Sequence, residues 1–381
     1  MILVTIFWLT FFLSSVYLIF IILIIYGTFH LPKGIESETP FISVIIAARN
    51  EERNIYECMI SVLTQDYPDD KYEVIIVDDR SSDKTAEIVR EVMNNNSRIK
   101  LIQINQLYPS LAPKKYALQQ GIAFSNGEII LTTDADCRPQ LSWIKTMVQY
   151  FSPEVGFVAG FSPLIPVQGK NSFGGTFLTT DSLGLAVLAA GSIGIGWGTT
   201  CTGRNLAYRR KVYDTIGGFN TFGHYVSGDD DLLLHYVRTK TSWQIRYAAN
   251  PKSIVPSTIQ HGLKEFINQR KRHASKFRAY PWDIKCLTAG IYLLNLLLFI
   301  SLLGFFCIPG KFMIPILAYG VKYVADILVL ITGQKIFKIR ISHIFFPIVS
   351  LFYPLYILIF GAWGTFGKFQ WKGNTYQSEI K

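Results

Sequence analysis

Residues 127–138 read GEIILTTDADCR, an apolar and β-branched run that ends in two carboxylates, Asp134 and Asp136. Such a run predicts a buried strand with the two acids just beyond its carboxyl end. Carboxylates at positions i and i+2 repel each other unless a cation lies between them, and Mg²⁺ or Mn²⁺ suits such hard oxygen ligands and bridges to phosphates. The stretch predicts a divalent-metal and diphosphate site, with a solvated acidic turn as the alternative.

The composition mixes apolar spans with a charged middle region. The chain has 381 residues, 50% of them hydrophobic, and a net charge of +10. Residues 2–26 carry no charge and would form about 37 Å of helix at ~1.5 Å per residue, which exceeds the ~30 Å thickness of bilayer hydrocarbon. Residues 286–310 and 344–367 are equally free of charge, and residues 312–331 contain two charged side chains. These patterns predict an uncleaved N-terminal anchor and about three further transmembrane or interfacial helices.

The distribution of basic residues predicts the side of the membrane on which the middle region lies. Lysines and arginines are enriched immediately before the span at 286–310, which is typical of a cytoplasmic flank. The five cysteines form no CxxC pair, which agrees with a reducing compartment and gives no zinc site. The expected regions are an N-terminal transmembrane helix at 1–27, a cytosolic domain at 28–285, helices within 286–367 and a basic tail at 368–381. Four full crossings would leave that tail outside, so one apolar segment is expected to be interfacial.

Apolar strands alternate with amphipathic helices in the middle region. The predicted strands are residues 41–48, 73–77, 99–104 and 128–133. We expect Asn50 to cap the first helix, Ser81 or Ser82 to cap the second, and a third helix over residues 114–123. This alternation predicts an α/β fold with a doubly wound, mostly parallel sheet. A Gly-rich segment at 183–197 is too short to span and is expected to form a buried or interfacial helix that lines the acceptor path.

Three of the predicted strands end in charged residues. These are Arg49 and Glu51 after the first strand, Asp78 and Asp79 after the second, and Asp134 and Asp136 after the fourth. Ligands of such sheets bind beyond the carboxyl ends of the strands, so these groups are expected to converge. Neither a GxGxxG nor a P-loop motif is present. Asp78 and Asp79 either accept hydrogen bonds from a base or ribose, or cap the following helix.

The motifs and their order resemble the membrane-bound family 2 glycosyltransferases, which include cellulose, hyaluronan and chitin synthases. The matching stretches are AARNEERN at 47–54, VDDRSSDKT at 77–85, Lys114 ahead of ALQQGI, TTDADC at 132–137, CTGRNLAYRR at 201–210, SGDDD at 227–231 and QRKR at 269–272. The resemblance covers roughly residues 38–285. It implies a GT-A fold, a nucleotide-sugar donor with a UDP-sugar favoured, a divalent cation, and inversion at the anomeric carbon.

The resemblance also implies roles for individual residues at the donor side. Asp136, together with Asp134, would bind the metal, which neutralises charge on the diphosphate leaving group. The residues expected to contact the donor are Ala47, Arg49, Glu51, Asp78, Asp79, Lys114 and Asp134. Lys115 is adjacent to Lys114 and could take its place, or Lys114 could be a solvated residue at a helix start.

At the acceptor side, Asp230 aligns with the general base of the family, and Asp229 and Asp231 are its competitors. Acids at a helix start also complement the helix dipole, and carboxylates packed this closely are expected to raise one another's pKa. Contacts with the acceptor or diphosphate are expected from Asp229, Gly203, Gln269, Arg270 and Arg272. Arg204 would meet an acidic or phosphorylated acceptor, or point to solvent.

One departure from the family pattern concerns the aromatic residue after Arg272. The family has QxxRW, whereas His273 stands at the Trp position, which argues against a platform for a growing polymer. The expected partners are therefore a lipid-linked or glycan acceptor and membrane lipids attracted to the basic helix. The alternatives are a processive polysaccharide synthase and a non-catalytic scaffold that binds nucleotide sugars. Nucleic-acid binding is not favoured, because the basic charge gathers beside a predicted span.

Overall fold

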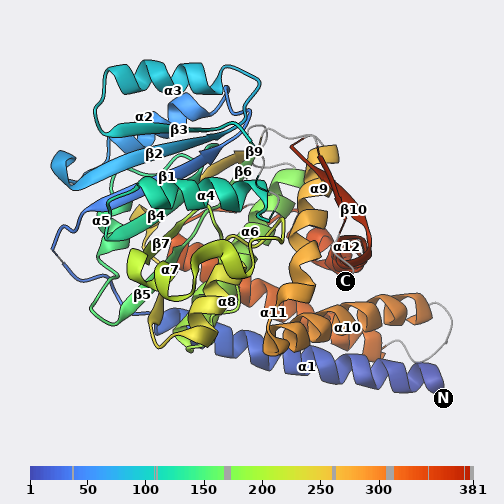
Figure 1. Cartoon of the computed structure of the whole chain (residues 1–381). Helices are drawn as coiled ribbons and strands as arrows, with labels where there is room; N and C mark the ends of the chain where they lie inside the picture. The colour runs from blue at the N-terminus through green and yellow to red at the C-terminus, as the bar shows by residue number, and fades with distance from the viewer. Residues whose placement is uncertain are drawn as a thin grey trace.

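A seven-stranded sheet, in the order β3-β2-β1-β4-β7-β5-β8, forms the centre of the α/β domain (Figure 1). The computed structural model describes residues 1–381 except 37, 107, 109, 167–172, 260–262, 306–312, 342, 373 and 378–381. The strands are β1 Ile42–Ala48, β2 Tyr72–Asp79, β3 Ile99–Ile104, β4 Ile129–Asp134, β5 Val155–Gly160, β7 Leu206–Arg209 and β8 Gln244–Ala248. β1 pairs in parallel with β2 and β4, and β7 is antiparallel to β4 and β5. The predicted mostly parallel sheet is confirmed.

Helices cover both faces of this sheet because alternate residues of its strands are apolar on both sides. Along β1, Val44 and Ile46 belong to one core cluster, and Ile45 belongs to the other. The helices of the first cluster are α2 Ile55–Leu63, α3 Thr85–Asn94 and α5 Trp143–Val148. Those of the second are α4 Pro113–Phe124, α6 Phe173–Gly194, α7 Arg210–Thr215 and α8 Asp231–Lys240. Because helices cover both faces, the sheet is doubly wound, as predicted.

Two predicted helix caps are wrong. Asn50 does not begin a helix: it has a φ of 54°, and its side-chain oxygen accepts a hydrogen bond from the backbone N–H of Ser82 at 2.8 Å. α3 begins at Thr85, and Asp83, not Ser81 or Ser82, accepts the Thr85 N–H at 3.0 Å. The loops that follow β1 and β2 are therefore bonded to each other, which a reading of each loop by itself does not reveal.

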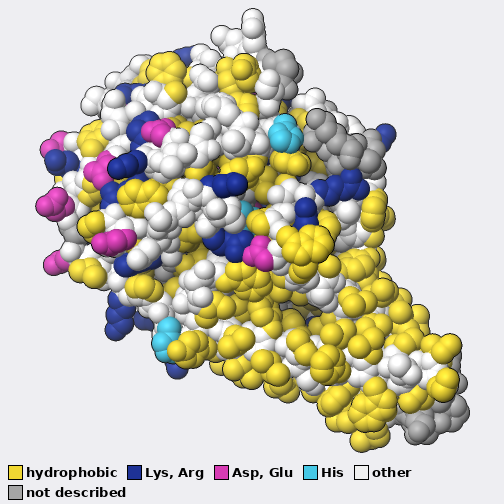
Figure 2. Space-filling model, turned by 60° about the horizontal axis from the view of Figure 1, so that its bottom comes forward, with side chains coloured by type: hydrophobic (Ala, Val, Ile, Leu, Met, Phe, Trp, Pro, Cys, Tyr) yellow, Lys and Arg dark blue, Asp and Glu magenta, His cyan; other side chains and the backbone are white. Residues whose placement is uncertain are grey.

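Five helices of the described residues are long and apolar enough to cross a membrane. They are α1 Ile2–Phe29, α6 Phe173–Gly194, α10 Trp282–Phe305, α11 Met313–Phe337 and α12 Phe346–Phe366. α6 starts ten residues before the predicted segment, so the estimate of its length was wrong, although it is the most buried of the five, with 56% of its apolar window inside the protein. Figure 2 shows hydrophobic side chains covering the part that projects from the domain, whereas charged side chains gather on the domain.

The directions of these helices can be read from contacts at their ends. Phe7 of α1 packs against the position of Gly304 near the end of α10, so these two helices are antiparallel. Lys335, near the end of α11, lies over the Phe29 ring at the end of α1, so α1 and α11 run the same way. α12 ends where Gly364 meets Ala274, beside the α/β domain. α1, α10 and α11 thus project together, and α12 lies beside α9 and the hairpin (Figure 1).

Close contact between backbones joins α1 to α6. A Cβ atom added at Gly191 would lie 2.1 Å from the carbonyl oxygen of Ile24, and one at Gly194 would lie 2.1 Å from the carbonyl oxygen of Gly27. Only glycine allows two helices to approach this closely. α1 is therefore packed into the body of the protein along its last turns.

The chain ends in a small hairpin that returns to the α/β domain. β10 Lys368–Trp371 pairs antiparallel with β11 Asn374–Gln377, and the hairpin contacts α9 Leu263–Ala274. A second small sheet pairs β6 Leu164–Pro166 with β9 Ser257–Ile259, and 3₁₀ turns lie at Asp69–Lys71, Gly218–Thr221, Pro251–Ser253 and Ser275–Ala279. Part of the predicted basic tail, residues 373 and 378–381, lies outside the described residues.

Candidate active site

The carboxyl ends of β1, β2 and β4 meet at one edge of the sheet. In the strand register, Ala47 is opposite both Val77 and Asp134, and Ala48 is opposite Asp78. The small side chain of Ala47 thus lies between two strands that end in carboxylates. The predicted convergence of these strand ends is present in the structure.

Lys114 joins this edge to a second group of acids. Its Nζ lies 2.8 Å from Asp134 Oδ1 and 2.8 Å from Asp229 Oδ2. Burial opposes its charge, but the two carboxylates outweigh burial and raise the pKa of Lys114. Lys115 points elsewhere, because its Nζ donates to the backbone carbonyls of Phe222, Tyr225 and Ser227. The choice between the two lysines is thereby decided in favour of Lys114 as the one at the site.

Asp136 lies in the same region without a cationic partner among the described residues. The Ser257 hydroxyl donates to Asp136 Oδ2 at 3.1 Å, and burial and the nearby Asp134 raise the pKa of Asp136. No group of three or more His, Cys, Asp or Glu side chains gathers in the described part of the chain. Asp136, which has no ion pair within the described residues, and Asp134, which Lys114 contacts, are carboxylates of the kind that fit Mg²⁺ or Mn²⁺, ions that keep several waters or phosphate oxygens in their coordination shell.

The three acids at the start of α8 occupy different environments. Asp230 is the N-cap residue: its side chain accepts the Asp231 N–H at 2.7 Å and the Gly203 N–H at 3.0 Å. Asp231 is buried and accepts hydrogen bonds from Thr200, Cys201 and Tyr280. Among the three side chains, Asp230 remains the most exposed, at 19%, against 8% for Asp229 and 4% for Asp231. Asp231 is occupied by structural contacts, whereas Asp230 faces the site.

The expectation that these acids raise one another's pKa is wrong for Asp230. Burial raises its pKa, but the ammonium of Lys276, 3.4 Å away, and the hydrogen bonds from backbone N–H groups lower it further, and the net pKa is below the usual range. Lys276 also contacts Asp231 at 2.5 Å. Asp230 is therefore an ionised carboxylate at neutral pH.

The loop that holds Gly203 and Arg204 crosses the end of β4. The Thr132 hydroxyl donates to the carbonyl of Gly203 at 3.3 Å, and a Cβ atom at Gly203 would lie 2.8 Å from Asp229 Oδ2. Arg204 is partly buried and has no ion pair with an acid in the described part of the chain: its guanidinium donates to the Ser162 carbonyl at 3.2 Å. The charge of Arg204 lowers the pKa of both Asp134 and Asp136, although burial acts more strongly in the opposite direction on each.

The acids after β2 do not cap α3. Asp78 accepts the Ser81 N–H at 3.2 Å and so fixes the turn. Asp79 is buried, accepts hydrogen bonds from Arg80 at 2.7 Å, and has Arg49 Nη1 at 3.8 Å. The capping alternative is thus excluded for both, and Asp79 lies between the guanidinium groups of Arg49 and Arg80.

α9 carries the predicted basic residues on different faces. Arg272 lies close enough to the edge of the sheet to lower the pKa of Asp134, although burial and Lys114 have larger effects. Its guanidinium also lies 5.4 Å from the ring centroid of Trp371 in the C-terminal hairpin. Arg270 is instead buried and paired with Asp181 of α6 at 2.8 Å. This pairing disagrees with the prediction that Arg270 contacts the diphosphate. The described contacts include no hydrogen bond of the Gln269 side chain, so the role of Gln269 stays a prediction.

Comparison with known proteins identifies the domain. Residues 43–217 match the sequence model of glycosyl transferase family 2. These residues form a family 2 glycosyltransferase domain. The chain is 35% identical over 116 residues to the glycosyltransferase AglE of Haloferax volcanii, covering 30% of this chain and 37% of that protein. It is 29% identical over 266 residues to a beta-monoglucosyldiacylglycerol synthase of Trichormus variabilis, covering 67% of this chain and 53% of that one. The chain thus spans about a third to a half of the length of these relatives.

A solved structure extends the similarity to the whole fold. A mannosyltransferase from Pyrobaculum calidifontis, in complex with GDP-Man and Mn²⁺, aligns with a TM-score of 0.59 and 18% identity over 95% of this chain and 98% of that one. The glycosyltransferase domain therefore has the expected GT-A fold, and the similarity includes the apolar helices.

Sequence reasoning missed two contacts beside the glycosyltransferase domain. Lys276 pairs with Asp230 and Asp231, and it lies in the 3₁₀ turn Ser275–Ala279 that follows α9, beyond the matched QRKR stretch. Lys372 of the hairpin donates to the Arg49 carbonyl at 2.6 Å and to Glu51 Oε1 at 2.7 Å. No local pattern connects positions more than three hundred residues apart, so the second contact had no signal in the sequence.

Proposed function

We propose that the chain is an inverting glycosyltransferase that moves a sugar from a nucleotide diphosphate donor to a lipid-linked or glycan acceptor. The observation that carries the proposal is the position of Lys114, which is within 2.8 Å of both Asp134 and Asp229. One side chain thus connects the acids at the end of β4 with the acids at the start of α8. A donor held at the first group presents its anomeric carbon to the second.

The donor side supplies binding and charge. Asp134 and Asp136 would hold Mg²⁺ or Mn²⁺, and the bound cation neutralises the diphosphate as the glycosidic bond breaks. Asp79 is positioned by Arg49 and Arg80 to accept a hydrogen bond from the nucleoside. Ala47, Glu51 and Asp78 complete this edge. A UDP-sugar is the proposed donor.

The acceptor side supplies the base. Inversion in one step requires removal of a proton from the attacking hydroxyl, and Asp230 is the ionised and most exposed acid of its group. The backbone N–H of Gly203 and the N–H of Asp231 fix both of its oxygens. Asp229 holds Lys114, while Gln269 and Arg272 approach from α9 to bind the diphosphate and acceptor.

The helix arrangement supports a catalytic domain at the cytoplasmic face of a membrane. α1, α10 and α11 are the proposed crossings, because their far ends lie together, as the contact of Phe7 with Gly304 shows. α12 packs against α11 where it starts, through Phe346 and Tyr323, and ends beside the domain, where Gly364 meets Ala274; it is the proposed interfacial helix. An odd number of crossings with the N-terminus outside puts the domain and the tail on one side, which removes the topological conflict of four spans. The synthase of Trichormus variabilis, whose name describes a glucosylated lipid product, supports a lipid acceptor.

Transfer by membranes that contain the full chain tests the proposal. We expect sugar from a labelled UDP-sugar, out of a panel of nucleotide sugars, to enter a chloroform-soluble or glycan product with Mn²⁺ present. Asp230→Asn should reduce the rate by about 10² to 10⁴, the usual contribution of a general base. The control Asp214→Asn changes an acid of α7 outside the site. Full activity of the Asp230→Asn variant would refute its role, and a product ladder on a sizing gel would indicate a processive synthase.

A further inference from the structure

α9 presents three faces to three surroundings. One face packs against α6 and α12 through Phe266, Arg270 and Ala274. Another, which contains Arg272 and His273 and continues to Lys276, faces the catalytic acids. The third contains Lys264, Ile267, Asn268 and Lys271, whose spacing of three and four residues places them in one stripe. The first face is taken up by packing and the second by the catalytic acids, so the third face is left without a role in either.

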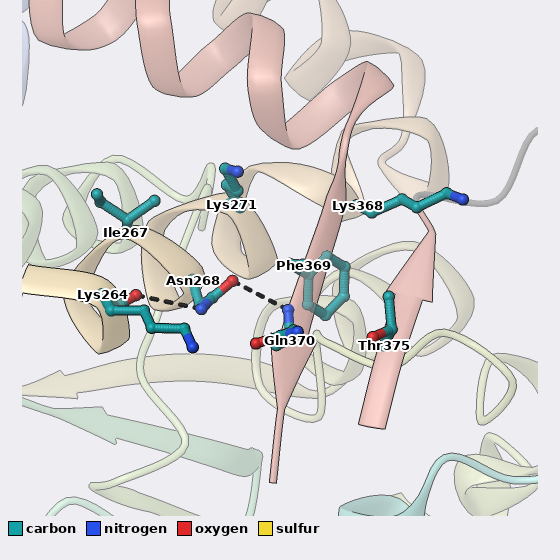
Figure 3. A pocket seen from close by; sticks show the side chains of 8 residues that line it. All are labelled: Lys264, Ile267, Asn268, Lys271, Lys368, Phe369, Gln370 and Thr375. Atoms are coloured by element: carbon teal, nitrogen blue, oxygen red, sulfur yellow. Dashed lines mark hydrogen bonds between the residues drawn. The ribbon is translucent and has the colours of Figure 1, made fainter. Parts of the chain in front are cut away.

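The third face and the C-terminal hairpin enclose a groove of about 600 Å³ (Figure 3). It is lined by Lys264, Ile267, Asn268, Lys271, Lys368, Phe369, Gln370 and Thr375. Asn268 fixes its two walls, because its side-chain oxygen accepts the Gln370 N–H at 3.0 Å while its nitrogen donates to the Lys264 carbonyl at 3.2 Å. A volume of this size is in the range of pockets that hold small molecules.

The charge of the groove is positive and unbalanced. Lys264, Lys271 and Lys368 line it, no acidic residue does, and none of the three forms an ion pair within the described part of the chain. By contrast, the lysines that face the catalytic acids are all paired with carboxylates. A ligand of this groove should therefore carry negative charge.

The surface beside the groove is apolar. Lys271 Nζ lies 4.4 Å from the ring centroid of Trp363, and Trp363 belongs to an exposed apolar stripe of α12 with Ile359 and Phe366. Phe366 precedes Lys368 by two residues, so the stripe leads directly to the hairpin. Inside the groove, Ile267 adds apolar surface, and Phe369 is buried in the wall. A ligand that matches both parts has an anionic head and a hydrocarbon tail, as bilayer lipids do.

We infer that this groove binds the phosphate of an anionic bilayer lipid, with the acyl chain lying along Ile359, Trp363 and Phe366 of α12. The lysines supply charge-assisted hydrogen bonds to the phosphate oxygens, and the tryptophan lies at the depth of the headgroups. The site is separate from the acceptor site, because α9 faces the catalytic acids with other residues. Free phosphate is not the expected ligand, since it would leave the apolar stripe without a partner.

Titration of the purified full chain in neutral detergent with dihexanoyl phosphatidylglycerol tests the inference, with thermal stability as the readout. The double variant Lys264→Gln/Lys368→Gln should bind this lipid roughly thirtyfold more weakly, since each lysine near an anionic lipid contributes about a fivefold factor. Lys264→Arg/Lys368→Arg keeps the charge and should bind as the wild type does. Lys211→Gln/Lys252→Gln removes two exposed lysines of the α/β domain and should have no effect.

The possible results are distinguishable. Dihexanoyl phosphatidylcholine and inorganic phosphate should not stabilise any variant. Equal affinity of the wild type and the glutamine variant for phosphatidylglycerol would overturn the inference, and so would equal stabilisation by inorganic phosphate, which would indicate a free-phosphate site. Both lysines are at the surface, so the variants should fold, and equal melting temperatures without lipid verify this. Because the readout is binding, the result does not depend on whether the chain transfers a sugar.

Discussion

The protein contains two groups of buried charges that are built differently. At the edge of the sheet, the acids outnumber their cationic partners. Lys114 and Lys276 pair with Asp134, Asp229, Asp230 and Asp231, whereas the donors to Asp136 within the described residues are the Ser257 hydroxyl and the Cys137 thiol. In the second group, which lies under the α/β domain among α6, α9, α11 and α12, each of two acids has its own base. Asp181 pairs with Arg270 and accepts from Tyr353, and Asp326 pairs with Lys322 and accepts from Ser350.

The difference separates a site for a ligand from a structural contact. A buried charge without a partner is costly, so an excess of carboxylates persists where a cation completes the site during function. Balanced pairs between apolar helices need nothing further, and they fix the way in which helices pack. The comparison predicts that changes at the edge affect activity and that changes under the domain affect stability.

The largest effect at the edge is expected from metal removal. EDTA, or Asp136→Asn, should reduce transfer by about 10² to 10³, in line with the loss of one electrostatic contact to the transition state. The melting temperature of Asp136→Asn should not fall, because the change removes a charge that has no cationic partner. Added Mn²⁺ should restore the chelated enzyme and not the variant. An Asp136→Asn variant with normal dependence on Mn²⁺ would place the metal elsewhere.

A change under the domain should show the opposite pattern. Arg270→Met leaves Asp181 buried without its partner and should lower the free energy of unfolding by about 3 to 5 kcal/mol. Asp181→Leu/Arg270→Met removes both charges and should recover most of that loss. Denaturation of the detergent-solubilised chain measures both variants. If the single variant kept its stability and lost only activity, Arg270 would belong with the catalytic residues.

The third prediction concerns Lys276 and the pH dependence of the transfer rate. Its ammonium helps to hold the pKa of Asp230 below the usual range, so Asp230 should stay ionised as pH falls, and the acidic limb of the rate profile should lie well below neutral. Lys276→Gln removes this effect, raises the pKa of Asp230 and should move the acidic limb to higher pH. Lys276→Arg retains the charge and should leave the limb in place. An unchanged profile for Lys276→Gln would mean that another group titrates.

The smallest effect is expected from the hairpin. Lys372→Met removes the contacts with Glu51 and the Arg49 carbonyl and should raise the KM for the donor about two- to fivefold, in the range of partly exposed ion pairs. The value of kcat should change little, because Lys372 contacts the loop after β1 and not the catalytic acids at the start of α8. Lys84→Met, on the neighbouring loop after β2, provides the control. A fall in kcat alone would assign Lys372 to the chemical step.

The sequence predicted the parts of the fold that depend on local pattern. The strands of the parallel half were found because apolar runs end abruptly in polar residues, and the acids at their ends fall where parallel topology requires. Lys114 was identified by resemblance to the family, and its alternative, Lys115, was separated from it by the structure alone. Resemblance to a family contributed Asp230, whose position at a helix start has no unique meaning by itself.

Long-range contacts account for what the sequence did not reveal. Asn50 has the composition of a cap, but its side chain bonds to a loop that follows another strand. Arg270 and Arg272 look equivalent in QRKR, and only packing against Asp181 separates them. The antiparallel β7 is short, and the proposed interfacial position of α12 depends on where the hairpin after it attaches. In each case the deciding partner is remote along the chain.

The contact of Gly191 and Gly194 with α1 limits how this protein can be simplified for biochemical work. Deleting residues 1–27 in order to obtain a soluble enzyme would remove the surface on which α6 rests, and would uncover small and apolar side chains of a helix that supports the glycosyltransferase domain. Residues 1–27 thus support α6 within the fold and also belong to a proposed crossing. Purification of the active protein should begin from the entire polypeptide in detergent or lipid.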